Sequence, residues 1–120
     1  MKLGKILRKD GSALLARCGL TETAAERARG LLAHSSLAEE EGLWFPNHSS
    51  VHTFFMKFPI DVAFVDRRGA VIAVYHSLKP WRHTWIHPFA LRGGIVEASA
   101  GLFAKVQLQL GEELRVCFSS

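Results

Sequence analysis

Alternating apolar and polar residues run through most of the chain and predict β-strands. Side chains along a strand point to opposite faces in turn, so a two-residue period indicates a strand with one buried face. A charged loop at 39–45 leads into a short strand, and DRRG at 66–69 has the composition of a hairpin turn. The longer strands predicted in this way cover residues 13–18, 50–58, 59–65, 70–78, 95–100 and 112–118.

One segment carries the signals of a helix. Thr23 and Glu26 form a capping box, so we expect a helix to begin near Ala24 and to end near Gly30. The sequence therefore predicts an α+β fold, mostly antiparallel β, in which a small rolled sheet or barrel carries one clear helix near the N-terminus. We expect a single domain over residues 1–120, with residues 1–12 as a loose N-terminal extension.

The stretch VHTFFMKFPIDVAFVD, residues 51–66, places polar residues inside an apolar run. After Pro59 both strand faces are apolar, which predicts a central strand in which Asp61 is buried. A buried carboxylate needs a partner, and Lys57 lies on the other side of the Pro59 corner. We expect an ion pair between Lys57 and Asp61 that pins this corner, and a catalytic role for Asp61 is the alternative.

A long basic and aromatic loop is predicted at residues 79–94. No acidic residue occurs between Arg67 and Val96, so this part of the chain should present a positive surface. Aromatic rings among cations commonly hold nucleic acid or another anionic partner. The alternative is that the tryptophans pack beneath the loop and cover one end of the sheet. The predicted binding residues are Lys57, Lys79, Trp81, Arg82, His83 and Trp85.

Composition narrows the class of protein further. The chain has 120 residues, a formal net charge of +4 and an ordinary globular share of hydrophobic residues. No apolar run is long enough to span a membrane, and the N-terminus lacks the apolar core of a signal peptide. We expect a cytoplasmic protein with Cys18 and Cys117 as free thiols in terminal strands. Export, with a signal peptide trimmed from the sequence and a disulfide between the two cysteines, is the alternative.

Several blocks of the sequence resemble the family known as domain of unknown function 192, the uncharacterised ACR group. The blocks are AAERARGLL, EEEGLWF, HTFFMKFPIDVAFVDRRGAVI, LKPWR and IVEASAG with LGEEL, and together they run from about residue 20 to residue 118. The resemblance implies a compact β-rich fold with one helix, and it implies no activity. Phe58 stands where this family usually has Asn-Thr, which removes polar groups beside Lys57. The matching signature positions are Arg29, Gly30, Gly42, His52, Met56, Lys57, Pro59, Asp61, Asp66, Gly69, Glu97 and Gly101.

Two functions fit these observations. The first, which we prefer, is a non-catalytic binding module for an anionic small molecule or a protein partner, with nucleic acid as a weaker candidate. The second is a small hydrolase-like enzyme in which His52, Asp61 and Glu97 serve as acid/base groups. An enzyme needs these three side chains in one cleft, whereas a binding module tolerates their separation. We expect no cofactor and no metal, because neither pair of histidines spaced by four residues lies on a predicted helix.

Overall fold

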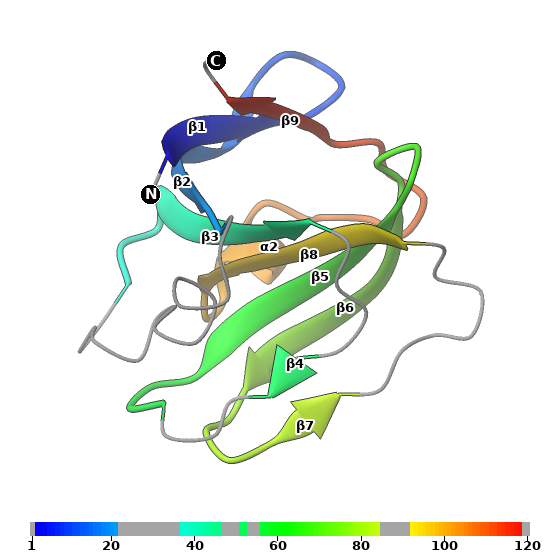
Figure 1. Cartoon of the computed structure of the whole chain (residues 1–120). Helices are drawn as coiled ribbons and strands as arrows, with labels where there is room; N and C mark the ends of the chain where they lie inside the picture. The colour runs from blue at the N-terminus through cyan, green and yellow to red at the C-terminus, as the bar shows by residue number, and fades with distance from the viewer. Residues whose placement is uncertain (1, 22–36, 47–50, 53–55, 85–91, 119–120) are drawn as a thin grey trace.

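Nine strands and one short helix make up the part of the chain that the structure, a computed structural model, describes: residues 2–21, 37–46, 51–52, 56–84 and 92–118 (Figure 1). The elements are β1 (Lys2–Leu7), β2 (Ala13–Leu20), β3 (Glu41–Pro46), β4 (Val51–His52), β5 (Ile60–Asp66), β6 (Val71–Leu78), β7 (His83–Thr84), β8 (Arg92–Ser99), α2 (Leu102–Lys105) and β9 (Arg115–Phe118).

Seven of the strands form one rolled sheet, in the order β6-β5-β8-β3-β2-β1-β9. Neighbours in this sheet are antiparallel except β2 and β3, which are parallel. The two remaining strands, β4 and β7, pair with each other at the lower end of the view in Figure 1. The edges of the large sheet are therefore β6 and β9.

The α+β class predicted from the sequence is wrong. The described residues are 58% strand and 5% helical, and their helix, α2, has four residues near the C-terminus. The helix expected near Ala24 lies outside the described residues. The fold class was mispredicted because the sheet is built from pairings between segments that are distant in sequence, which local sequence signals do not report.

A closed barrel does not form either. The described edges β6 and β9 approach each other only at one end, where Ala70 and Glu113 make an isolated bridge. The backbone N–H of Val71 donates to the carbonyl of Glu112 at 2.9 Å, and that of Leu114 donates to Gly69 at 2.8 Å. Closure would need such bonds along both strands, so a seam remains between the two edges.

Residues 1–12 were predicted to form a loose N-terminal extension. In the structure Lys2–Leu7 form β1, which pairs with β2 on one side and with β9 on the other. Ile6 is fully buried in the core. An interior strand at the N-terminus ties both ends of the chain into the sheet.

The central position predicted for the 59–65 strand is confirmed. β5 lies between β6 and β8, and every residue from Ile60 to Val65 is buried. Ala63 and Val65 face one apolar core, together with Phe103 of α2. The alternate residues of β5 face a second core on the other side of the sheet, with members Leu43, Phe45, Met56, Ile60, Val62, Phe64 and Ile95.

Candidate functional site

Asp61 is held by backbone amides and not by Lys57. Its carboxylate is 0% exposed. One oxygen, Oδ1, accepts hydrogen bonds from the backbone N–H of Ser77 at 2.7 Å and of Gly101 at 3.1 Å. The other, Oδ2, accepts one from the N–H of Phe103 at 2.9 Å. Lys57 is exposed, so the predicted ion pair at the corner is wrong, although the predicted burial of Asp61 is confirmed.

These bonds make Asp61 the cap of α2. The first residues of a helix have backbone N–H groups without helical partners, and a side chain at the N-cap usually accepts from them. The N-cap of α2 is Gly101, which has no side chain and a φ of 90°. Asp61 supplies the missing acceptor from β5 and also binds the end of β6 through Ser77. The carboxylate thus joins three segments that are far apart in sequence.

Glu97 is buried on the opposite face of the sheet. It pairs in register with Val62 of β5 and Leu43 of β3, both of which belong to the second core. Its side chain is 6% exposed, and burial raises the pKa of its carboxyl to about 8. Burial therefore favours the protonated form of this carboxyl in the folded protein.

Two of the three candidate acid/base residues, Asp61 and Glu97, do not share a cleft. Asp61 and Val62 are consecutive on β5, and Glu97 is opposite Val62, so the two carboxyls lie on opposite faces. His52 is on β4, where the register places it opposite His83 of β7. The described residues contain no group of three or more His, Cys, Asp or Glu side chains that could hold a metal ion.

Four of the predicted binding residues lie in segments at one end of the β5–β6 hairpin. Ile60 pairs with Leu78, so the segment before β5 and the turn after β6 leave the sheet together (Figure 1). Lys57 in the first segment and Lys79 and Arg82 in the second are exposed. Trp81 is 57% exposed, and its φ of 63° places it in a left-handed turn conformation. We call Lys57, Lys79, Trp81 and Arg82 the basic end.

The two remaining predicted binding residues are His83 and Trp85. His83 begins β7 directly after Arg82, and its backbone pairs with His52. Trp85 lies outside the described residues. The alternative in which the tryptophans pack beneath the loop does not hold for Trp81, because more than half of its surface is exposed.

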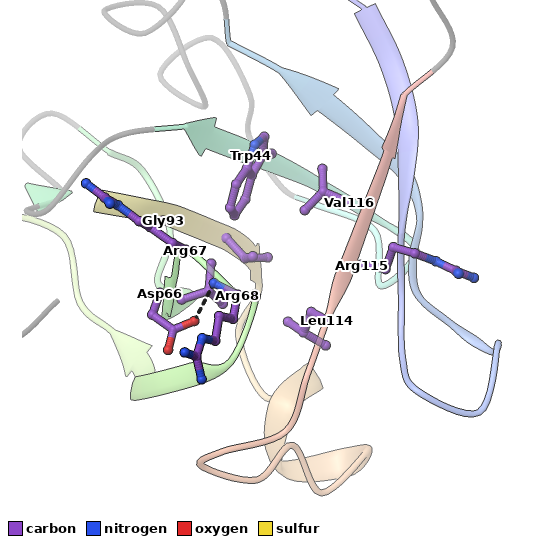
Figure 2. A pocket seen from close by; sticks show the side chains of 11 residues that line it. Trp44, Asp66, Arg67, Arg68, Gly93, Leu114, Arg115 and Val116 are labelled. Atoms are coloured by element: carbon purple, nitrogen blue, oxygen red, sulfur yellow. Dashed lines mark hydrogen bonds between the residues drawn. The ribbon is translucent and has the colours of Figure 1, made fainter. Parts of the chain in front are cut away.

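A hollow that sequence analysis missed lies at the other end of the hairpin, along the seam. It has a volume of about 350 Å³ and is bordered by the β5–β6 turn, β8, β3 and β9. Figure 2 shows Trp44, Leu114 and Val116 pointing toward a common space, with Arg68 near Asp66 at its rim. Arg115 also borders the hollow, but its side chain points away from that space.

Two glycines shape this hollow. A Cβ on Gly94 would lie 2.4 Å from the ring of Trp44, so the bare backbone lets the indole lie against β8. A Cβ on Gly93 would lie 2.1 Å from the carbonyl oxygens of Val65 and Asp66. The sequence signal available was the GG pair itself, which indicates a close approach of another chain segment. It does not say which segment approaches, since Trp44 is about fifty residues away in sequence.

Fold and site together define a small rolled-sheet protein with an exposed basic end and a seam hollow, and without an assembled pair of carboxyls among the described residues. The family model DUF192, described as Uncharacterized ACR, matches residues 5–116, and the chain belongs to this family. This confirms the resemblance seen in the sequence. No functionally curated protein matches the chain significantly.

Two solved structures share the fold. A protein of unknown function from Novosphingobium aromaticivorans is similar with a TM-score of 0.77 and 23% identity, over 94% of this chain and 83% of that one. A candidate transcription regulator from Sinorhizobium meliloti is similar with a TM-score of 0.77 and 17% identity, over 96% of this chain and 92% of that one. At these identities the likeness shows the fold alone. Among the described residues, no helix has the length and apolar character that crossing a membrane requires.

Proposed function

We propose that the protein is a non-catalytic binding module that holds an anionic partner at its basic end. The observation that carries this proposal is the exposure of Lys57, Lys79 and Arg82 at the same end of the hairpin as Trp81, which is 57% exposed. Large exposed aromatic residues among cations favour recognition, because the ring supplies contact area and the cations supply attraction over distance. His83 and Trp85, which continue the same segment, complete the proposed surface.

Binding is better supported than the hydrolase-like alternative. An acid/base pair must reach the same substrate, but Asp61 and Glu97 lie on opposite faces of the sheet. Both oxygens of Asp61 already accept backbone hydrogen bonds, so this carboxylate is committed to holding α2. Neither feature prevents the basic end from binding a partner.

We infer that the partner is an acidic protein segment or an anionic small molecule, met in the cytoplasm. The basic end is small, with three cations and one ring among its defining residues, which suits a short acidic segment more than the long backbone of a nucleic acid. The cytoplasmic assignment is supported by the two free thiols, which are typical of a reducing compartment.

Fluorescence anisotropy with two labelled probes tests this proposal: a poly-glutamate peptide and oligo-dT, each titrated at several salt concentrations. We expect the double variant Lys79→Ala/Arg82→Ala to bind the peptide about tenfold more weakly than wild type, which corresponds to about 1.4 kcal/mol. Trp81→Ala should weaken binding by roughly 1–3 kcal/mol. The matched control is Lys5→Ala/Arg17→Ala, which removes two exposed cations from β1 and β2.

Equal binding of the peptide by wild type and both basic-end variants would refute the proposal. Tighter binding of oligo-dT than of the peptide, with a salt slope that falls in the double variant, would identify nucleic acid as the partner instead. Thermal melting of each variant shows whether the fold is intact.

A further inference from the structure

The seam hollow has an apolar interior. Val65, Val96 and Leu114 are buried, and Trp44 and Val116 are half-buried. Its volume of about 350 Å³ falls within the range of small-molecule sites, which are mostly apolar with a few polar groups at defined positions. The interior would therefore accept a short hydrocarbon chain.

The rim of the hollow is positive. Arg67 and Arg68 are exposed in the β5–β6 turn, and no ion pair to either guanidinium is found within the described residues. Among the described lining residues Asp66 is the one carboxylate, and its Oδ1 accepts hydrogen bonds from the backbone N–H of Arg68 at 2.9 Å and of Ala70 at 3.0 Å. Asp66 thus holds the turn that carries the two arginines, whose guanidinium groups point in different directions in Figure 2.

A second hollow adds to this positive charge. It has a volume of about 330 Å³ and shares Arg68, Leu114 and Arg115 with the first. Its other lining residues are Arg8, Lys9 and Glu113. Arg8 is already paired with Glu112, in two hydrogen bonds of 2.6 and 2.8 Å. The remaining cations outnumber the single carboxylate of Glu113, so the potential at the rim near Arg68 favours an anion.

We propose that the seam hollow binds a small amphipathic anion, a carboxylate with an apolar chain. The apolar chain of this ligand lies against Trp44, Leu114 and Val116. Its carboxylate lies at the rim beside Arg68, with Arg67 in the same turn. A guanidinium pairs with a carboxylate through two parallel hydrogen bonds, which gives orientation as well as affinity. This site is separate from the basic end, because it lies at the opposite end of β5 and β6 and uses other residues.

Three ligands that share one hydrocarbon chain and differ in their polar group test the charge preference of the seam hollow: octanoate, octanol and octylammonium. Each is titrated, below micelle formation, into uniformly ¹⁵N-labelled full-length protein. For octanoate we expect saturable shifts of the Trp44 indole N–H and of the Gly69, Leu114 and Val116 amides. Octanol should bind the same residues more weakly, and octylammonium more weakly still.

Two variants separate the two halves of the site. Arg67→Gln/Arg68→Gln should weaken octanoate binding about tenfold and leave octanol binding unchanged. Val116→Leu narrows the hollow with a conservative apolar change and should weaken both ligands. Lys5→Gln/Arg17→Gln, which removes two exposed cations from β1 and β2, is the matched control and should bind octanoate as wild type does. The readout is the shift of residues at the hollow, so the outcome is independent of the function proposed above.

The proposal is overturned if octanoate causes no saturable shifts at the hollow. It is also overturned if octylammonium binds there as tightly as octanoate, or if Arg67→Gln/Arg68→Gln has the affinity of wild type. Should Val116→Leu fail to fold, the arginine variant and the three-ligand comparison still decide the matter.

Discussion

The carboxylate of Asp61 accepts a hydrogen bond of 2.9 Å from the backbone N–H of Phe103, a residue 42 positions further along the chain. Both residues are fully buried. The bond caps α2 from β5 and fixes Phe103 in the first apolar core. Asp61 is therefore a structural residue whose effect on the fold does not depend on Lys57.

Replacing Asp61 should destabilise the protein far more than replacing Lys57. Asp61→Ala leaves three backbone N–H groups without their acceptor, two of them at the start of α2, and we expect a loss of roughly 3–5 kcal/mol in the free energy of unfolding. Lys57→Ala removes an exposed side chain and should change that free energy by less than about 0.5 kcal/mol. Urea denaturation of both variants measures the difference.

Asp61→Asn is the matched control for these variants. It keeps one carbonyl oxygen that can still accept hydrogen bonds but loses the second acceptor, so its stability should lie between wild type and Asp61→Ala. A loss on Lys57→Ala as large as that on Asp61→Ala would contradict this assignment and restore the ion pair.

Glu97 should make stability depend on pH. Burial raises its pKa from 4.5 to about 8, so between these pH values the folded state keeps a proton that the unfolded state has released. Because the folded state binds more protons, the free energy of unfolding falls as pH rises. The contribution of Glu97 is fully present below about pH 4.5 and is lost by about pH 8, a change on the order of 5 kcal/mol.

Chemical denaturation across this pH range compares wild type with Glu97→Gln. The amide has no proton to lose, so the variant should show a much flatter dependence, and its advantage over wild type should grow as pH rises. Glu113→Gln, which changes an exposed carboxylate, should follow wild type. Parallel curves for wild type and Glu97→Gln would show that this carboxyl titrates normally in the folded protein.

The two cysteines should differ in reactivity and should not form a disulfide. Cys18 on β2 pairs with Gly4, and Cys117 on β9 pairs with Lys5, so β1 separates them. Two strand spacings amount to about 10 Å, which exceeds the Cα separation that a disulfide spans. Cys18 is fully buried, and burial raises the pKa of its thiol to about 12.

Titration with Ellman's reagent measures this difference. In the native protein only the half-buried Cys117 should react readily, and Cys18 should react after unfolding. Reductant should leave the melting temperature unchanged. A clear drop in melting temperature on reduction would reveal a disulfide and would count against a cytoplasmic location.

The sequence predicted the candidate site only in part. The apolar composition of β5 was enough to place Asp61 in a buried strand, because a strand that is buried on both faces is apolar at nearly every position. The partner of Asp61 was not predictable, since the nearest cation in sequence, Lys57, is exposed and the true partners are backbone amides. Backbone amides occur at almost every residue, so no sequence pattern points to the ones that will be used.

The seam hollow was also not predictable from the sequence. Arg67 and Arg68 stood out in the sequence as part of an acid-free stretch, but Trp44 and Val116 gave no sign that they would face the same space. They do so because the sheet curves until its edge strand β9 comes opposite β3, while the sheet stays open between β6 and β9.

By itself the sequence predicted strands near β2, β3, β5, β6, β8 and β9, the burial of β5, the position of the turn at Asp66 and membership of the family. These are local properties, because each depends on neighbours along the chain. Of the strand predicted over 50–58, the described residues contain only β4. The tertiary structure alone decided the parallel pairing of β2 with β3, the interior place of β1, the open seam and the opposite faces of Asp61 and Glu97. Those features follow from which distant strands pair and in which register, and pairing free energy is shared over many weak contacts that no short segment encodes.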